Sequence, residues 1–128
     1  MRDDMVIGTG VDIIEISRIQ KAIDRSGELF LRRVFTLSEQ AYCQARHLSA
    51  IHYAGRFAAK EAAFKALGTG WAGKIRWVDV EVESGSGPPQ LKLVGAAADR
   101  FQAIGATKAH LSISHSRDYA VAMVIFEG

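Results

Sequence analysis

Small and β-branched residues alternate along the first predicted element, residues 5–14. Successive side chains of a strand point to opposite sides, so this segment has two faces. One face carries Gly8, Gly10 and Asp12, and the other carries Ile7, Thr9, Val11 and Ile13. The pattern predicts a buried strand that ends at a carboxylate.

From about Glu15 the apolar spacing becomes helical, with Ile16, Ile19 and Ile23 on one side and a stop at Ser26-Gly27. The stretch Thr36-Leu-Ser-Glu39 has the pattern of a capping box and predicts a second helix through about His47. Two further helices are predicted. They are the alanine-rich segment that begins near Arg56 and ends at Gly68, and residues 95–104 before Gly105.

Residues 75–83 alternate as a strand, SGSGPP is typical of a turn, and QLKLV is the expected hairpin partner. The tail, residues 109–127, predicts two strands around a turn at His115 to Asp118. Together these elements predict an α+β fold. We expect a single compact domain over residues 1–128, with five short strands in a small, largely antiparallel sheet and about four helices.

Composition narrows the class of protein. A chain of 128 residues can bury roughly two thirds of its unfolded surface as one domain. The lone Cys43 has no partner within the chain, and Asp12 interrupts the N-terminal apolar run. We therefore expect a cytoplasmic protein without a membrane span. Sixteen basic and fourteen acidic residues give a net charge of only +2, which does not argue for nucleic acid as a partner.

The helix that ends at Gly68 places charges beside its apolar side. Phe57 and Phe64 share one face, and Glu61 and Lys65 lie along its shoulder. The Lys60 stem is expected over the core with its ammonium pointing outward. Glu61 and Lys65 either form an ordinary i,i+4 pair worth roughly 0.2 to 0.5 kcal/mol, or point together at a metal and a phosphate.

An aspartate in an otherwise apolar strand is costly to bury without a partner. Asp12 either caps the following helix or approaches Glu61. In the second case the two carboxylates supply the number of protein ligands with which Mg²⁺ is typically held.

Two loops are candidates for phosphate binding. GTGWAG, residues 68–73, matches G-x-G-x-x-G but follows a helix and precedes a strand, which is the wrong order for a dinucleotide fold. It is either a helix C-cap or a glycine loop whose amides approach a phosphate. SISHSRDY places His115 and Ser116 at a hairpin tip, where they either form local hydrogen bonds or bind a phosphate.

Three segments together resemble the holo-[acyl-carrier-protein] synthases, the short trimeric type of 4′-phosphopantetheinyl transferase. They are GTGVDIIEISRI, YAGRFAAKEAAFKALGTG and SISHSRDYAVAMVI. The most specific part is G-x-D at residues 10–12 combined with K-E-A-x-x-K at residues 60–65. The resemblance implies Mg²⁺-dependent transfer of 4′-phosphopantetheine from coenzyme A to a serine of acyl carrier protein. Adenosine 3′,5′-bisphosphate would be released, and the reaction would support fatty acid biosynthesis.

The same resemblance implies roles for individual residues. Asp12 and Glu61 would be metal ligands and, with Lys65 at the phosphates, the catalytic residues. The coenzyme A site would be lined by Arg56, Lys65, Gly68, Thr69, Gly70, His115 and Ser116. In this family the site lies between subunits of a homotrimer. The group that takes the serine proton stays open, with Glu61 acting through water at the metal as one candidate.

The first helix carries a basic stripe at i, i+3, i+4 and i+7 spacing: Arg18, Lys21, Ala22 and Arg25. Such a stripe is ordinarily a solvated face, but the family's carrier protein is small and acidic, so we also consider a docking role. Two rival functions remain. A non-catalytic adaptor would bind acidic partners without coenzyme A, and a Mg²⁺ hydrolase would use water as the acceptor.

Overall fold

A long helix, α4 (Ser49–Leu67), lies at the centre of the computed structural model, which describes residues 4–68 and 74–128. Its buried side chains are mostly alanine: Ala54, Ala58, Ala59, Ala62, Ala63 and Ala66. Alanine favours the helix and leaves room for neighbouring backbone to come close. The helix is therefore packed on several sides at short range.

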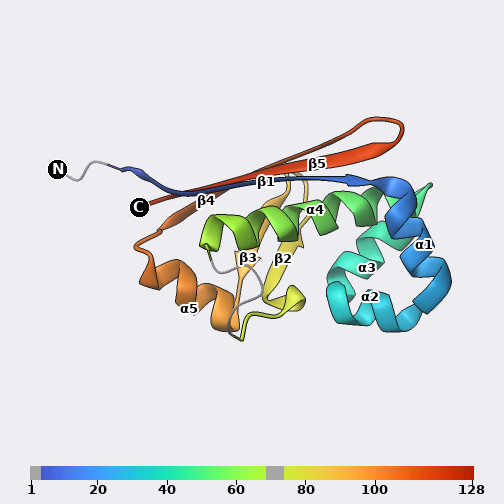
Figure 1. Ribbon diagram of the computed structural model, residues 1–128, viewed down its shortest axis with the longest axis horizontal. Coiled ribbons are helices and arrows are strands. Elements are labelled where there is room, and N and C mark those ends of the chain that lie inside the picture. Colours follow the sequence, from blue (N-terminus) through green and yellow to red (C-terminus); the bar gives the residue numbers. More distant parts are fainter. Residues whose placement is uncertain (1–3, 69–73) are drawn as a thin grey trace.

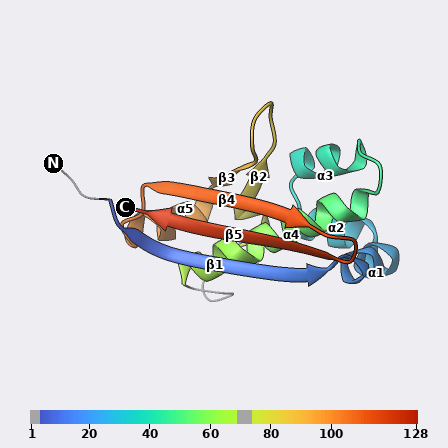
Figure 2. The same cartoon turned by 90° about the horizontal axis from the view of Figure 1, so that it is seen from above.

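A three-stranded antiparallel sheet lies along one side of α4, in the order β1 (Val6–Glu15), β5 (Tyr119–Glu127) and β4 (Lys108–His115). Figures 1 and 2 show the strands side by side, with the helices gathered below one face of the sheet. Gly10 and Asp12 of β1 both face the helix. A Cβ on Gly10 would lie 1.8 Å from the carbonyl oxygen of Ala62. Glycine is thus required for α4 to approach β1 this closely.

The remaining elements lie around α4, on the side away from the sheet and at its ends (Figure 1). Three short helices gather near its N-terminal end: α1 (Ile16–Ser26), α2 (Glu28–Val34) and α3 (Leu37–Gln44). A two-stranded hairpin and one helix follow α4 in the chain: β2 (Val80–Glu83), β3 (Gln90–Leu93) and α5 (Gly95–Ala103). No helix of the described residues is long and apolar enough to cross a membrane.

The predicted α+β class is confirmed, with antiparallel sheets and five α-helices among the described residues. The capping box is also present, because the Thr36 hydroxyl accepts from the Glu39 amide and the Glu39 carboxylate accepts from the Thr36 amide. The sequence pattern did not predict α2. Gly27, at φ 50°, turns the chain between α1 and this seven-residue helix.

The predicted strand over residues 75–83 is wrong in its first half. Trp77–Asp79 form a 3₁₀ turn, and only Val80–Glu83 pair with β3. The Asp79 carboxylate accepts hydrogen bonds from the Arg76 amide and guanidinium, which stabilises the turn. The apolar alternation continues through this turn, so periodicity alone did not reveal it.

The prediction that β1 is a buried strand holds for one face only. Val11 and Ile13 point away from α4 and are 58% and 64% exposed. The strand also continues past Asp12 to Glu15, which is the N-cap of α1 and makes no side-chain cap bond. Asp12 is therefore not a helix cap, and its carboxylate is available for another role.

Lys60 does not point outward as predicted. Its side chain is fully buried, and its ammonium pairs with the Glu39 carboxylate at 2.8 Å. The ammonium also donates to the carbonyl oxygens of Trp77 and Val80. Burial lowers the pKa of Lys60, and the Glu39 charge opposes that effect. This pair ties α3 and the start of β2 to α4, one residue before Glu61.

Candidate functional site

Three predicted site residues come together where β1 lies along α4. They are Asp12 of β1 and the α4 residues Glu61 and Lys65. The Lys65 ammonium donates to the Asp12 carboxylate at 3.3 Å and to the Val11 carbonyl oxygen at 2.9 Å. The Asp12 side chain is 17% exposed and that of Lys65 is 52% exposed. Of the two alternatives that the sequence left open for Asp12, the structure favours the approach to α4 over a helix cap.

Glu61 is half-buried in this group. Burial raises its pKa, the nearby Asp12 charge raises it further, and Lys65 lowers it. The Lys65 ammonium contacts Asp12 rather than forming the simple i,i+4 pair with Glu61 that the helix pattern allowed. The charges of Asp12 and Glu61 are thus close enough to interact, and the half-exposed Lys65 acts on both carboxylates.

The donor set suits a hard divalent cation. Asp12 and Glu61 contribute carboxylate oxygens from a strand and a helix that are packed tightly together. Mg²⁺ is typically held by one or two carboxylates together with phosphate oxygens and water. No group of three or more histidine, cysteine or acidic residues gathers in residues 4–68 and 74–128, so the described chain offers no all-protein cage. The residues fit Mg²⁺ bound jointly with a phosphate substrate.

A second cluster surrounds Arg56, another residue predicted for the site. The Arg56 side chain is only 5% exposed. Its guanidinium donates to the Ser84 hydroxyl and the His52 carbonyl oxygen. Its buried Nε has no hydrogen-bond partner in the part of the chain that the structure describes. Burial lowers the pKa of His52, and the charges of Arg56, Arg46 and His115 lower it further. Four basic side chains therefore share one region.

The sequence analysis missed Arg46 and His52 in this cluster. His52 precedes Arg56 by one helical turn, and that i,i+4 spacing was the available signal. The available signal for Arg46 was its i,i+4 spacing from Tyr42, whose ring it stacks on just after the end of α3.

The other predicted site residues lie at turns. His115 ends β4 and is exposed, and the Ser116 hydroxyl accepts from the Tyr119 amide within the turn. Gly68 adopts φ 79° and caps α4 through hydrogen bonds to Lys65 and Phe64, so it is a C-cap. The predictions for Thr69 and Gly70 lie outside the described residues.

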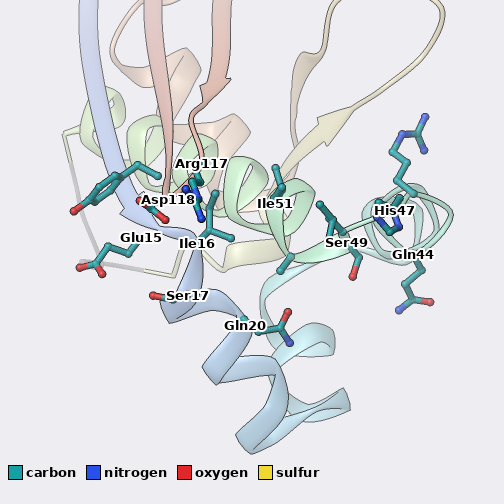
Figure 3. Close-up of a pocket in the computed structure, with 14 residues that line it drawn as sticks. Glu15, Ile16, Ser17, Gln20, Gln44, His47, Ser49, Ile51, Arg117 and Asp118 are labelled. Atoms are coloured by element: carbon teal, nitrogen blue, oxygen red, sulfur yellow. The ribbon is translucent and has the colours of Figure 1, made fainter.

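A hollow of about 910 Å³ opens beside the β4–β5 turn (Figure 3). Its walls come from the start of α1, the loop before α4 and the residues after Ser116. In Figure 3, Ser17 and Gln20 of α1 lie across from His47 of the loop and Ser49, the first residue of α4. Arg46 also lines this hollow, which therefore borders the basic cluster.

The predicted basic stripe lies on α1. Arg18, Lys21 and Arg25 are exposed, and Ala22 is half-buried. The opposite side of the helix packs on the core through Ile19, which is 2% exposed. The stripe is thus accessible to a partner.

The fold is thus α+β, with carboxylates on β1 and α4 beside a lysine. Residues 8–124 match the 4′-phosphopantetheinyl transferase superfamily, and the chain belongs to it. The predicted transferase class is thereby confirmed.

Within this superfamily, the relatives are holo-[acyl-carrier-protein] synthases. The chain is 50% identical to one from Anaeromyxobacter sp. (strain K), over 97% of this chain and 98% of the relative. It is 48% identical to one from Koribacter versatilis, over 96% and 99%. The holo-(acyl-carrier-protein) synthase of Bacillus anthracis in complex with CoA (3′,5′-ADP) has 37% identity and a TM-score of 0.80, covering 97% of this chain and 98% of that one. The predicted resemblance is confirmed.

Proposed function

We propose that this protein transfers the 4′-phosphopantetheine group of coenzyme A to a serine of apo acyl carrier protein. The observation that carries the proposal is the meeting of Asp12, Glu61 and Lys65 between β1 and α4. The related synthases of Bacillus anthracis and Helicobacter pylori have been solved in complex with coenzyme A. The site suits transfer of a phosphate-linked group, for which positioning and charge neutralisation matter most.

The residues of this site would have different roles. Asp12 and Glu61 would hold Mg²⁺, and Lys65 would meet a phosphate of coenzyme A. When bound, Mg²⁺ would neutralise charge that develops on the pyrophosphate. Cys43 is buried, and burial raises its pKa to about 12, so it is unsuited as a nucleophile. A nucleophilic serine on the carrier is consistent with that.

The second part of the proposed coenzyme A site is the basic region around Arg56 and His115. Four basic side chains gathered in one region favour phosphate as the ligand. The hollow beside the β4–β5 turn gives that ligand access from solvent.

We propose a homotrimer in which these two regions meet between subunits. Arg56 and Lys65 are separated by about two and a half turns of α4, so they point to opposite sides of the helix. One chain therefore presents its two halves of the site in different directions. The outer face of the sheet is also apolar and exposed, with Val11, Ile13 and Met123 each 47% exposed or more. A second copy that covers this face is a physical reason for association.

The finer parts of the proposal are the products and the setting. Transfer of the phosphopantetheine group from coenzyme A leaves adenosine 3′,5′-bisphosphate. The holo carrier would serve fatty acid biosynthesis in the cytoplasm. Coenzyme A and acyl carrier protein are the partners that we propose.

A mass spectrum of the carrier tests the function. Incubation of the protein with coenzyme A, Mg²⁺ and apo carrier should add about 340 Da to the carrier, the mass of one phosphopantetheine group. Omitting the carrier provides the control for hydrolysis. Cleavage of coenzyme A at an equal rate without carrier would favour a Mg²⁺ hydrolase, and carrier binding with neither reaction would favour an adaptor.

The replacements Lys65→Ala and His115→Ala should each raise the Michaelis constant for coenzyme A by about tenfold. Each removes a group that would contact a phosphate, and a charge-assisted hydrogen bond is worth roughly 1.5 to 3 kcal/mol. Steady-state kinetics with coenzyme A varied measures the change. The matched control is Lys92→Ala, an exposed lysine on β3. Unchanged kinetics in both test variants would remove Lys65 and His115 from the site.

Reversing Arg18 and Arg25 to glutamate should raise the Michaelis constant for the carrier at least tenfold and leave that for coenzyme A nearly unchanged. Exposed charges mainly steer and orient an acidic partner, and salt screens them over about 8 Å at physiological ionic strength. Added salt should therefore weaken the carrier interaction of the unmodified protein selectively. Lys92→Glu is the control, and equal effects on both substrates would contradict a docking role for α1.

A further inference from the structure

Two guanidinium groups lie against the aromatic ring of Tyr42, on α3. The Arg46 Cζ lies 3.4 Å from the ring centroid, and the Arg56 Cζ lies 3.9 Å from it. These distances keep the two cations within about 7 Å of each other, although like charges repel. The negative face of an aromatic ring attracts guanidinium groups, and here one ring serves both.

Neither arginine has an acidic partner. The ion pairs found in residues 4–68 and 74–128 involve other basic residues. Arg46 instead donates to the Tyr42 carbonyl oxygen at 2.8 Å. Among the described residues, the buried Nε of Arg56 has no hydrogen-bond partner, and buried donors are rarely left unpaired in folded proteins. Two uncompensated cations and an unpaired buried donor indicate a site that accepts an anion.

A third basic side chain, that of His52, lies against the same ring. The His52 ring packs edge-on against Tyr42, with the two centroids 6.0 Å apart. Arg46 and Arg56 both lower the pKa of His52, after the larger effect of burial. Tyr42 is thus the shared contact of all three basic side chains.

We propose that Tyr42 is a positioning residue that holds Arg46 and Arg56 ready to receive a phosphate group of coenzyme A. This inference rests on the proposed function. By fixing the two side chains before the ligand arrives, the ring lowers the conformational entropy that binding would otherwise cost. The effect requires planar guanidinium groups, because a lysine ammonium keeps the charge but does not stack in the same way.

The first experiment compares Tyr42→Leu with Tyr42→Phe. Within the described residues, no hydrogen bond uses the Tyr42 hydroxyl, so phenylalanine should behave as the original residue does. Leucine should raise the Michaelis constant for coenzyme A about tenfold and leave kcat and the Michaelis constant for the carrier unchanged. The affinity for adenosine 3′,5′-bisphosphate, measured by calorimetric titration, should fall by a similar factor. This measurement needs no turnover.

The second experiment uses Arg46→Lys, at an exposed position where folding is not at risk. Lysine should weaken binding of adenosine 3′,5′-bisphosphate several-fold in the original background. It should cause little further loss when combined with Tyr42→Leu, because both replacements disrupt the same stacking. Fully additive losses would overturn the proposal. If Tyr42→Leu does not fold, Arg46→Lys decides alone, and unchanged binding overturns the proposal.

The outcomes separate this inference from the proposed function. Wild-type protein that neither binds adenosine 3′,5′-bisphosphate nor modifies the carrier would refute the proposed function itself. Wild-type protein that does both, with Tyr42→Leu binding equally well, would refute only the role of Tyr42. Equal losses in Tyr42→Phe and Tyr42→Leu would also refute it, because they would assign the effect to the hydroxyl rather than to the ring face.

Discussion

Asp12→Ala and Glu61→Ala should each reduce kcat/KM for the transfer reaction at least a hundredfold without unfolding the protein. Each replacement removes one of the two carboxylates that would hold the cation, and several kcal/mol of transition-state stabilisation depend on that charge. Asp12→Asn should be nearly as inactive, because an amide keeps the shape and loses the charge. The rate of carrier modification at saturating Mg²⁺ measures the effect.

The fold should survive these replacements because neither carboxylate is part of the core. The contact of Asp12 with Lys65 involves a half-exposed lysine, and ion pairs of this kind contribute little to stability. Glu83→Ala, at an exposed position on β2, provides the control for loss of a carboxylate elsewhere. Circular dichroism checks folding. Near-normal rates for either alanine variant at modest Mg²⁺ would refute the metal assignment.

Local patterns were sufficient to predict the elements that form the centre of this site. The alternation in β1 separated Gly10 and Asp12 from the outward residues, and the structure places both towards α4. Helical i,i+4 spacing placed Glu61 and Lys65 next to one another on the same face of α4. Both inferences depend only on backbone geometry within one element, which periodicity describes well.

Contacts between distant segments could not be predicted in the same way. The Lys60 stem was predicted over the core with its ammonium pointing outward, and Glu39 was assigned only to the capping box. In the structure the Glu39 carboxylate caps α3, pairs with Lys60 and accepts from the Val82 amide. One side chain with three roles leaves no repeated spacing to detect.

The basic cluster around Tyr42 was not predicted for the same reason. Arg46 follows Tyr42 by four residues, but Arg56 belongs to α4, and only packing of α3 against α4 brings Arg56 to the same ring. The exposed outer face of β1 could not be predicted either. Apolar residues on both faces of a strand predict burial, but they do not show what covers each face. The sequence therefore predicted the two halves of the site better than how they are arranged.

Gly10→Ala should lower the free energy of unfolding by about 3 kcal/mol, because overpacking against rigid neighbours is among the most destabilising changes. The added Cβ would lie 1.8 Å from the Ala62 carbonyl oxygen and 2.8 Å from its carbonyl carbon. Both atoms belong to the backbone of α4, so no side-chain rotation relieves the clash. The strand and the helix would have to move apart.

The same movement should also reduce activity, because Asp12 lies two residues beyond Gly10 on the strand and Glu61 precedes Ala62 on the helix. Gly85→Ala is the matched control, since a Cβ there meets nothing within 4 Å and the change should stay within about 0.5 kcal/mol. Urea denaturation of both variants measures the stability, and carrier modification at a temperature where both are folded measures activity. Equal stability of the two variants would mean that β1 and α4 are not held at the distance on which the carboxylate pair depends.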